Sequence, residues 1–153
     1  MQERQVGAQL GMLNNLLKRR MASWAADSEL SRVTGMQAMV IHYLAVADED
    51  RFQKDVEMQF GFRRSTATGI LQLMEQHGLL RREPVPQDGR LKRLVLTEDA
   101  LALDAEIRRR LQLTEAHMRE GISEAELETW FRVCDKIRGN LENIQRKASE
   151  GQE

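Results

Sequence analysis

Gln53-Lys-Asp-Val-Glu-Met-Gln-Phe60 opens the stretch that decides the fold, and it is followed by the turn Gly61-Phe62 and by Arg64-Ser-Thr-Ala-Thr-Gly-Ile-Leu-Gln-Leu-Met-Glu-Gln-His77. A glycine in the turn tolerates the left-handed backbone that two crossed helices need there. The second helix has one apolar stripe with the helical period, made of Ala67, Ile70, Leu71 and Met74. The pattern predicts a helix-turn-helix, although the helix pair alone also fits an ordinary amphipathic pair in an all-helical domain.

A basic hairpin follows between Leu80 and Leu96. Asp88-Gly89 is a strong turn signal, and Pro84 and Pro86 confine the preceding strand to a sheet edge. Five cations stand around this turn: Arg81, Arg82, Arg90, Lys92 and Arg93. Such a loop repels itself unless it meets an anion, and the narrow minor groove of DNA attracts arginine. The order of elements therefore predicts a winged helix-turn-helix. The alternative interpretation of the hairpin is a solvated surface turn without a partner.

The charge distribution supports a nucleic-acid partner. Residues 51–96 hold nine Lys or Arg and five Asp or Glu, a net charge of +4. The rest of the chain has a net charge of −5, so the total is only −1. A near-neutral chain therefore carries a basic segment on an acidic body, as a DNA-binding protein would.

The composition suits one domain over residues 1–153. One cysteine in 153 residues excludes a disulfide framework and fits a reducing compartment. The sequence has neither an apolar run of bilayer length nor a signal-peptide profile at its start. We therefore expect a cytoplasmic, nucleoid-associated protein without a membrane partner, ending in a disordered tail over residues 148–153.

Helices are predicted on both sides of the DNA-binding core, which we place at residues 35–97. The first runs from Val6 to Ala26, and the next begins at the capping box Thr34-Gly-Met-Gln37 and reaches about Ala47. A third runs from Glu98 to about Glu120, and a second capping box, Ser123-Glu-Ala-Glu126, opens the last. The chain is thus expected to be mainly α with a small β-hairpin wing.

The terminal helices carry more apolar surface than a core of this size covers. We therefore predict that residues 1–34 and 98–147 form a homodimer, which would give two DNA-binding cores and a pseudo-palindromic site. The apolar residues expected in the dimer interface are Leu10, Leu13, Leu17, Trp130, Cys134, Ile137, Leu141 and Ile144.

The chain resembles the MarR family of bacterial transcriptional regulators from about Val6 to Arg146. The motifs that carry the resemblance are Gln53-Lys-Asp-Val, Phe60-Gly61, Arg64-Ser-Thr-Ala-Thr, Gly78-Leu79, Asp88-Gly-Arg90, Lys92-Arg93 and Leu96-Thr-Glu98. The resemblance implies a dimeric winged-helix regulator whose recognition helix enters the major groove. It also implies that Arg90 reaches the minor groove and that Asp88 holds arginine side chains of the wing in place. The chain departs from the family pattern at Phe52, Glu57 and Arg63.

The side-chain chemistry assigns roles within the DNA-binding core. The phosphate contacts are expected from Arg63, Arg64, Ser65 and Thr66. Thr68, Gly69 and Gln72 are expected to reach base edges, since Gln can pair with adenine in the major groove. Arg90 is expected to read groove shape, while Lys92 and Arg93 either contact the DNA backbone or fold back onto the wing.

No catalytic or metal-binding constellation is visible, so we expect no enzyme, no cofactor and no metal. The histidines are isolated, and Cys134 is better explained as a small buried hydrophobe than as a redox switch. The family implies a small lipophilic or aromatic effector between the dimer helices and the core. In this chain that region would be lined by Met12, Trp24, Met36, Met39, His42 and Tyr43, although such residues at helical spacing are commonly plain core.

Two classes of function follow. The first is a sequence-specific double-stranded-DNA-binding transcriptional regulator, a ligand-responsive homodimeric repressor of a pseudo-palindromic promoter site. The alternative is a winged-helix protein-interaction module with weak or non-specific DNA binding. A protein-interaction module has no need of the wing cations beside Arg63 and Arg64, and it would lack the steep salt dependence of phosphate binding.

Overall fold

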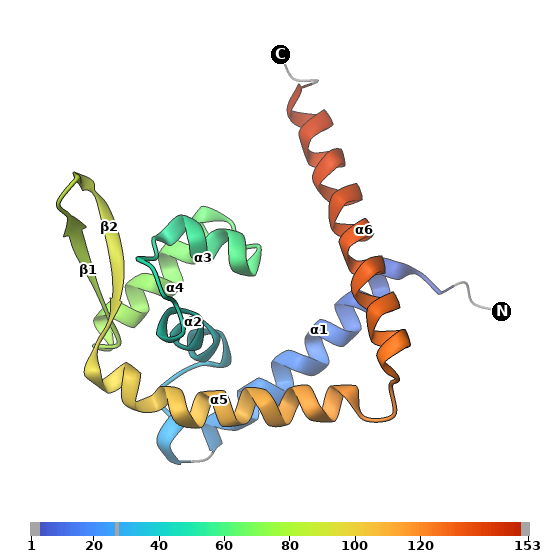
Figure 1. Cartoon of the computed structure of the whole chain (residues 1–153), viewed down its shortest axis with the longest axis horizontal. Coiled ribbons are helices and arrows are strands. Elements are labelled where there is room, and N and C mark those ends of the chain that lie inside the picture. The colour runs from blue at the N-terminus through green and yellow to red at the C-terminus, as the bar shows by residue number, and fades with distance from the viewer. Residues whose placement is uncertain (1–3, 27, 151–153) are drawn as a thin grey trace. The chain divides into compact units, whose positions relative to one another are not determined.

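The computed structural model describes residues 4–26 and 28–150, and its elements follow the predicted order (Figure 1). The prediction of a mainly helical winged helix-turn-helix is confirmed. The elements are α1 (Val6–Ala22), the 3₁₀ helices η1 (Ser23–Ala26) and η2 (Ser28–Leu30), α2 (Gly35–Ala45), α3 (Gln53–Phe60), α4 (Arg64–Gln76), β1 (Leu80–Val85), β2 (Asp88–Leu96), α5 (Glu98–Arg119) and α6 (Glu124–Glu150).

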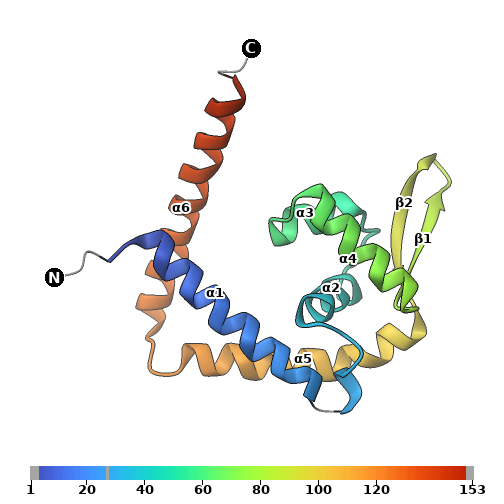
Figure 2. The same cartoon turned by 180° about the vertical axis from the view of Figure 1, so that it is seen from behind.

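The helix-turn-helix is formed by α3 and α4. The backbone N–H of Phe52 donates to Asp55 Oδ2 at 2.8 Å, which caps the start of α3. Gly61 ends α3 in the left-handed region, with φ 65°, where a side chain would be strained. Phe60 and Phe62 then stack with ring centroids 5.5 Å apart. These contacts fix the direction in which α4 leaves the turn (Figure 2).

The hairpin is tied to the end of α4. Gly78 adopts φ 70°, and the N–H of Leu79 donates to the carbonyl of Met74 at 2.9 Å, the pattern of a glycine-terminated helix. Thr97 then closes the hairpin, because its hydroxyl donates to the Gly78 carbonyl at 2.7 Å. The same hydroxyl accepts from the N–H of Ala100 at 3.3 Å and so caps α5.

The turn of the hairpin differs from the prediction. Val85 pairs directly with Asp88, so the two turn residues are Pro86 and Gln87 rather than Asp88 and Gly89. Proline has the φ that the first central turn position requires, and it therefore prevails over the Asp-Gly signal. The register also shifts between Pro84, which pairs with Lys92, and Val85. Residues 89–91 of β2 consequently have no paired partner on β1.

The chain divides into two compact units, residues 1–112 and 113–153. The core of the first unit gathers fully buried side chains from α2, α4 and α5, among them Ile41, Leu71 and Ile107. Residues 51 and 52 add to the hairpin, since the N–H of Leu94 donates to the Arg51 carbonyl at 2.8 Å and Phe52 bridges to Arg93. The wing is therefore held on both sides of β2.

The second unit contains α6, and its predicted capping box is confirmed. The N–H of Ser123 donates to Glu126 Oε2 at 2.8 Å, and the N–H of Glu126 donates to Ser123 Oγ at 3.4 Å. The bonds from the Ser123 backbone and hydroxyl lower the pKa of Glu126, because they stabilise the charged carboxylate.

Three helix boundaries differ from the predictions. The first helix ends at Ala22, and residues 23–26 tighten into η1, which places Trp24 in the core at 3% exposure. The second stops at Ala45 rather than about Ala47. In the predicted tail, residues 148–150 continue α6, while 151–153 lie outside the described residues. The capping box at Thr34 is confirmed by reciprocal bonds with Gln37 of 3.0 and 3.1 Å.

Candidate nucleic-acid interface

The polar face predicted on α4 lies at the surface. The apolar side of the helix is buried through Ala67, Leu71 and Met74, each with 0% exposure. Thr68 is half-buried, and the other residues of the polar face are exposed: Arg64, Ser65, Thr66, Gly69 and Gln72. The helix thus presents small polar groups, an arginine and an amide to solvent along one side, a surface that a DNA groove can approach closely.

The start of α4 adds positive character to this face. Arg63 occupies the capping position in extended backbone, and its side chain makes no capping hydrogen bond. The first N–H groups of α4 therefore receive no cap from the residue that usually supplies one. Arg63 and Arg64 are both exposed at this positive helix end, where an anion is favoured.

A polar network joins α3, α4 and β1 behind the face. Gln53 Nε2 donates to Thr68 Oγ1 at 2.8 Å and to Glu57 Oε1 at 3.1 Å. Gln53 Oε1 accepts from Arg82 Nη1 at 3.3 Å, and Arg82 Nε donates to Glu75 Oε2 at 3.1 Å. Both residues of the Arg82–Glu75 pair are about one-third exposed or less. The network holds the recognition helix against both neighbouring elements.

The wing tip carries exposed cations. Arg90 and Lys92 are exposed, and Arg90 makes no side-chain hydrogen bond or ion pair within the described part of the chain. Asp88 Oδ1 instead accepts from the backbone N–H of Arg90 at 2.9 Å. Asp88 therefore contacts the backbone of the wing, whereas the family resemblance implied a contact with arginine side chains. This contact leaves the Arg90 guanidinium available to a partner.

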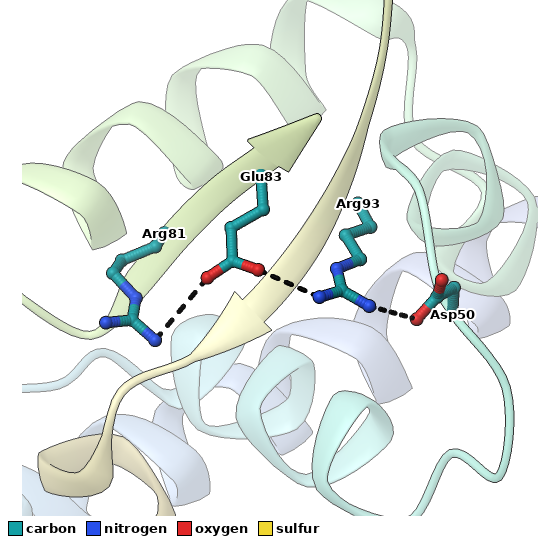
Figure 3. A network of polar contacts seen from close by, with 4 residues as sticks. All are labelled: Asp50, Arg81, Glu83 and Arg93. Carbon is teal, nitrogen blue, oxygen red and sulfur yellow. Dashed lines mark hydrogen bonds and ion pairs between the residues drawn. The ribbon is translucent and has the colours of Figure 1, made fainter. Parts of the chain in front are cut away.

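Arg93 is held quite differently from Arg90. Its Nη2 donates to Glu83 Oε2 at 3.0 Å and its Nη1 to Asp50 Oδ1 at 3.3 Å, while Arg81 Nη2 lies 3.5 Å from Glu83 Oε1 (Figure 3). These partners raise the pKa of Arg93, the hydrogen bond to Glu83 most and Asp50 next. Of the two roles predicted for Arg93, this geometry corresponds to folding back onto the wing.

Several residues of this arrangement were missed from the sequence. Gln53, Glu75 and Arg82 meet only in the folded chain, because 29 positions separate Gln53 from Arg82. Asp50 likewise received no role from the sequence, although it reaches Arg93 across 43 positions. For Glu75 and Glu83 the available signal was their position within an otherwise basic segment, since half-buried acids need cationic partners.

The residues predicted to line an effector pocket do not share one environment. Trp24 is buried at 3% exposure, whereas Met12 is 50% exposed on α1. Met36, Met39, His42 and Tyr43 are half-buried on α2. The open face of α1 around Gly11 and Asn15 includes Met12 alone of the predicted set. His42 Nδ1 lies 2.9 Å from Asp104 Oδ1, a contact between α2 and α5.

Within residues 4–26 and 28–150, no group of three or more His, Cys, Asp or Glu side chains could hold a metal ion. No helix in the same residues is both long and apolar enough to cross a bilayer.

The residues predicted for a dimer interface lie on α1 and α6. Leu10 and Leu17 on α1 are half-buried, and Leu13 is exposed. On α6, Cys134 and Ile137 are half-buried, while three larger side chains are exposed: Trp130, Leu141 and Ile144. Both α1 in the first unit and α6 in the second unit therefore have apolar side chains that remain exposed to solvent.

Comparison with known proteins agrees with this geometry. Residues 33–91, from the start of α2 to the tip of the wing, match the model of the MarR family. The solved transcription regulator MarR from Oenococcus oeni PSU-1 is 28% identical, with a TM-score of 0.77, over 88% of this chain and 99% of that one. MepR from S. aureus, solved as a DNA complex, is 20% identical, with a TM-score of 0.80, over 90% and 99% of the two chains.

A third relative extends the likeness of fold. The MarR family regulator from Listeria monocytogenes complexed with 26mer DNA is 19% identical, with a TM-score of 0.78, over 91% of this chain and 90% of that one. The proteins from O. oeni and L. monocytogenes are named as transcription regulators. The family model matches the helix-turn-helix and part of the wing, and the fold of the neighbours extends over about nine-tenths of this chain. The chain therefore resembles the MarR family in the sequence of its DNA-binding core and in its fold.

Proposed function

We propose that this chain is a sequence-specific, double-stranded-DNA-binding transcriptional regulator that acts as a homodimeric repressor in the cytoplasm, on the chromosome. The observation that carries the proposal is the exposed polar face of α4 in the same folded unit as a wing whose Arg90 guanidinium has no protein partner among the described residues. Two proteins of the same fold were solved with DNA. These features support binding of α4 in a major groove and of the wing in the adjacent minor groove.

The proposed DNA contacts follow the chemistry of each group. Arg63, Arg64, Ser65 and Thr66 bind phosphates at the start of α4, where the helix dipole also favours an anion. Thr68, Gly69 and Gln72 face base edges. Arg90 enters the minor groove, and Lys92 contacts the backbone beside it. Arg93 supports the wing from within, because both ends of its guanidinium are already paired with carboxylates.

The proposed dimer uses residues 1–34 and 98–147, with 35–97 as the DNA-binding core. Support comes from the exposed apolar side chains of α6, since Leu141 is 56% and Ile144 64% exposed. Side chains of this size gain about 1.5–3 kcal/mol each when fully buried. A two-fold dimer has two recognition helices and therefore selects two half-sites about one helical turn apart.

A small lipophilic or aromatic effector is the proposed signal. The half-buried Met36 and Met39 on α2 are adaptable side chains of the kind that suits such a ligand. If the effector binds more tightly to a form of the dimer that cannot contact both half-sites, effector binding releases the protein from the promoter. A thermal-shift series with phenolic acids tests this step, and an unchanged melting temperature with every compound would contradict it.

The alternative function, a protein-interaction module, is less well supported. Such a module gains nothing from a wing tip with two exposed cations beside Arg63 and Arg64. The mutual repulsion of these exposed cations is offset when they bind an anionic partner such as DNA.

Selection of tight binders from a pool of random duplexes tests the proposal. We expect the wild type to enrich one pseudo-palindromic sequence and Arg90→Ala to bind it more weakly. Arg108→Ala is a matched control, since it removes an exposed arginine of α5 outside the basic segment. If the wild type enriches no sequence, the regulator proposal fails and the protein-interaction function takes its place.

A further inference from the structure

The polar network behind α4 determines whether the Thr68 hydroxyl is free to donate or to accept a hydrogen bond. Thr68 lies on the polar stripe between Arg64 and Gln72, one helical turn from each. Its side chain is half-buried, so part of it remains open to a partner. Its hydroxyl accepts a hydrogen bond from Gln53 Nε2 at 2.8 Å.

The orientation of the Gln53 amide is fixed by its neighbours. Its oxygen faces Arg82 Nη1 at 3.3 Å, and a guanidinium can only donate. Its nitrogen faces Glu57 Oε1 at 3.1 Å and the Arg64 carbonyl at 3.4 Å, and both of these oxygens can only accept. Turning the amide over would place donor against donor and acceptor against acceptor. The nitrogen of Gln53 therefore points to Thr68.

Thr68 must consequently accept from Gln53 and keep its own proton for another partner. A hydroxyl has one proton to donate and two lone pairs to accept with. No described residue receives that proton in the hydrogen bonds of the structure. Threonine can also donate to the carbonyl four residues earlier in a helix, but the Arg64 carbonyl already lies against Gln53 Nε2.

We propose that Gln53 sets the specificity of Thr68 by making its hydroxyl a hydrogen-bond donor towards a base. In the major groove guanine offers the acceptors N7 and O6, whereas cytosine offers only its amino donor. Thr68 therefore favours guanine over cytosine at one position of each half-site. This inference rests on the proposed DNA-binding function. It adds that Arg82, by orienting the Gln53 amide, helps to determine which base Thr68 prefers.

The first test removes the hydroxyl and keeps the shape of the side chain. Thr68→Val and Thr68→Ser are compared with the wild type on duplexes that carry guanine or cytosine at each position of the selected site. We expect a preference for guanine of about five-fold at one position of each half-site, the worth of one neutral hydrogen bond. Thr68→Val loses the preference there, and Thr68→Ser keeps it.

The second test reverses the direction of the hydrogen bond. The exchange Gln53→Glu with Glu57→Gln keeps the net charge, and it puts an acceptor-only carboxylate against Thr68. Thr68 then donates to residue 53 and presents lone pairs to the DNA, so the preference moves from guanine to cytosine at the same position. In the Thr68→Val background the exchange leaves base preference at that position unchanged, which excludes a merely structural effect.

The outcomes separate this inference from the function on which it rests. Failure of the wild type to select any sequence removes the DNA-binding function itself. Sequence-specific binding with the same base preferences in Thr68→Val and the wild type overturns the inference alone. A wild-type preference for cytosine at the Thr68 position overturns the assigned direction of the bond. These results hold whether or not the exchanged variant folds, because the Thr68 variants decide them.

Discussion

Two arginines on β2 show how the environment divides roles between identical side chains. Arg93 is bound by Glu83 and Asp50, whereas Arg90 has no side-chain partner within the described residues. The sequence predicted a DNA contact for Arg90 and left two roles open for Arg93, because a basic hairpin does not reveal which cations are neutralised internally. The nearby acids become informative only when the fold shows that Asp50 reaches the wing.

Arg90→Ala is expected to weaken binding to the selected duplex without changing the fold. The guanidinium is exposed and unpaired within the protein, so the free energy of unfolding should change by less than about 0.5 kcal/mol. The dependence of log K on log salt concentration should become shallower by about one. Fluorescence anisotropy at several salt concentrations measures the affinity and its salt dependence, and denaturant unfolding measures the stability. An equal loss of affinity in Arg108→Ala would show that Arg90 has no specific role.

A second prediction at this scale concerns Glu106 on α5. Hydrogen bonds from Arg109, and then from Arg110, lower its pKa from 4.5 to about 2. A carboxyl whose pKa is depressed in the folded state contributes stability above pH 4.5, and it loses that contribution as the pH falls towards 2. Glu106→Gln should therefore melt below the wild type at pH 7 and converge with it near pH 2. A gap in melting temperature that persists at pH 2 would contradict this cause.

At the scale of elements, the sequence predicted correctly those helix ends that neighbouring residues determine. The capping boxes at Thr34 and Ser123 and the left-handed Gly61 all lie where the sequence placed them. The hairpin turn was misplaced because proline and Asp-Gly compete within a few residues. The network around Gln53 was missed because its members are brought together by tertiary packing.

Two glycines in helices should respond in opposite ways to alanine. A Cβ on Gly35 would lie 2.6 Å from Met21 Cβ, where α2 meets α1, so Gly35→Ala should destabilise the protein by about 1–3 kcal/mol. A Cβ on Gly69 meets nothing within 4 Å, so Gly69→Ala should stabilise the free protein by about 0.5–1 kcal/mol. Denaturant unfolding measures both changes, and a neutral Gly35→Ala would refute the close packing.

Gly69→Ala should also weaken DNA binding despite the added stability. The exposed position of Gly69 on α4 is expected to face the bases closely, and a methyl group there would hold the helix away from the groove. Binding to the selected duplex, measured beside stability, separates the two effects. Unchanged affinity would remove Gly69 from the proposed interface.

At the scale of the whole molecule, the exposed apolar side chains of α6 are the feature that supports the proposed dimer. Leu141→Glu combined with Ile144→Glu places two charges on side chains that are exposed within their own unit. The variant should fold and sediment as a monomer, because burial of these charges in an interface is unfavourable. It should also lose most affinity for the two-half-site duplex. A variant that remains dimeric would show that the interface lies elsewhere.

Sequence-specific binding by a dimer is measured as the affinity of the wild type for its selected duplex and for a scrambled duplex of equal composition, across a range of salt concentrations. We expect two chains per selected duplex, an affinity at least about 10³-fold above that for the scrambled duplex, and a steep fall of both affinities with salt. Equal and salt-insensitive binding of the two duplexes would contradict this expectation.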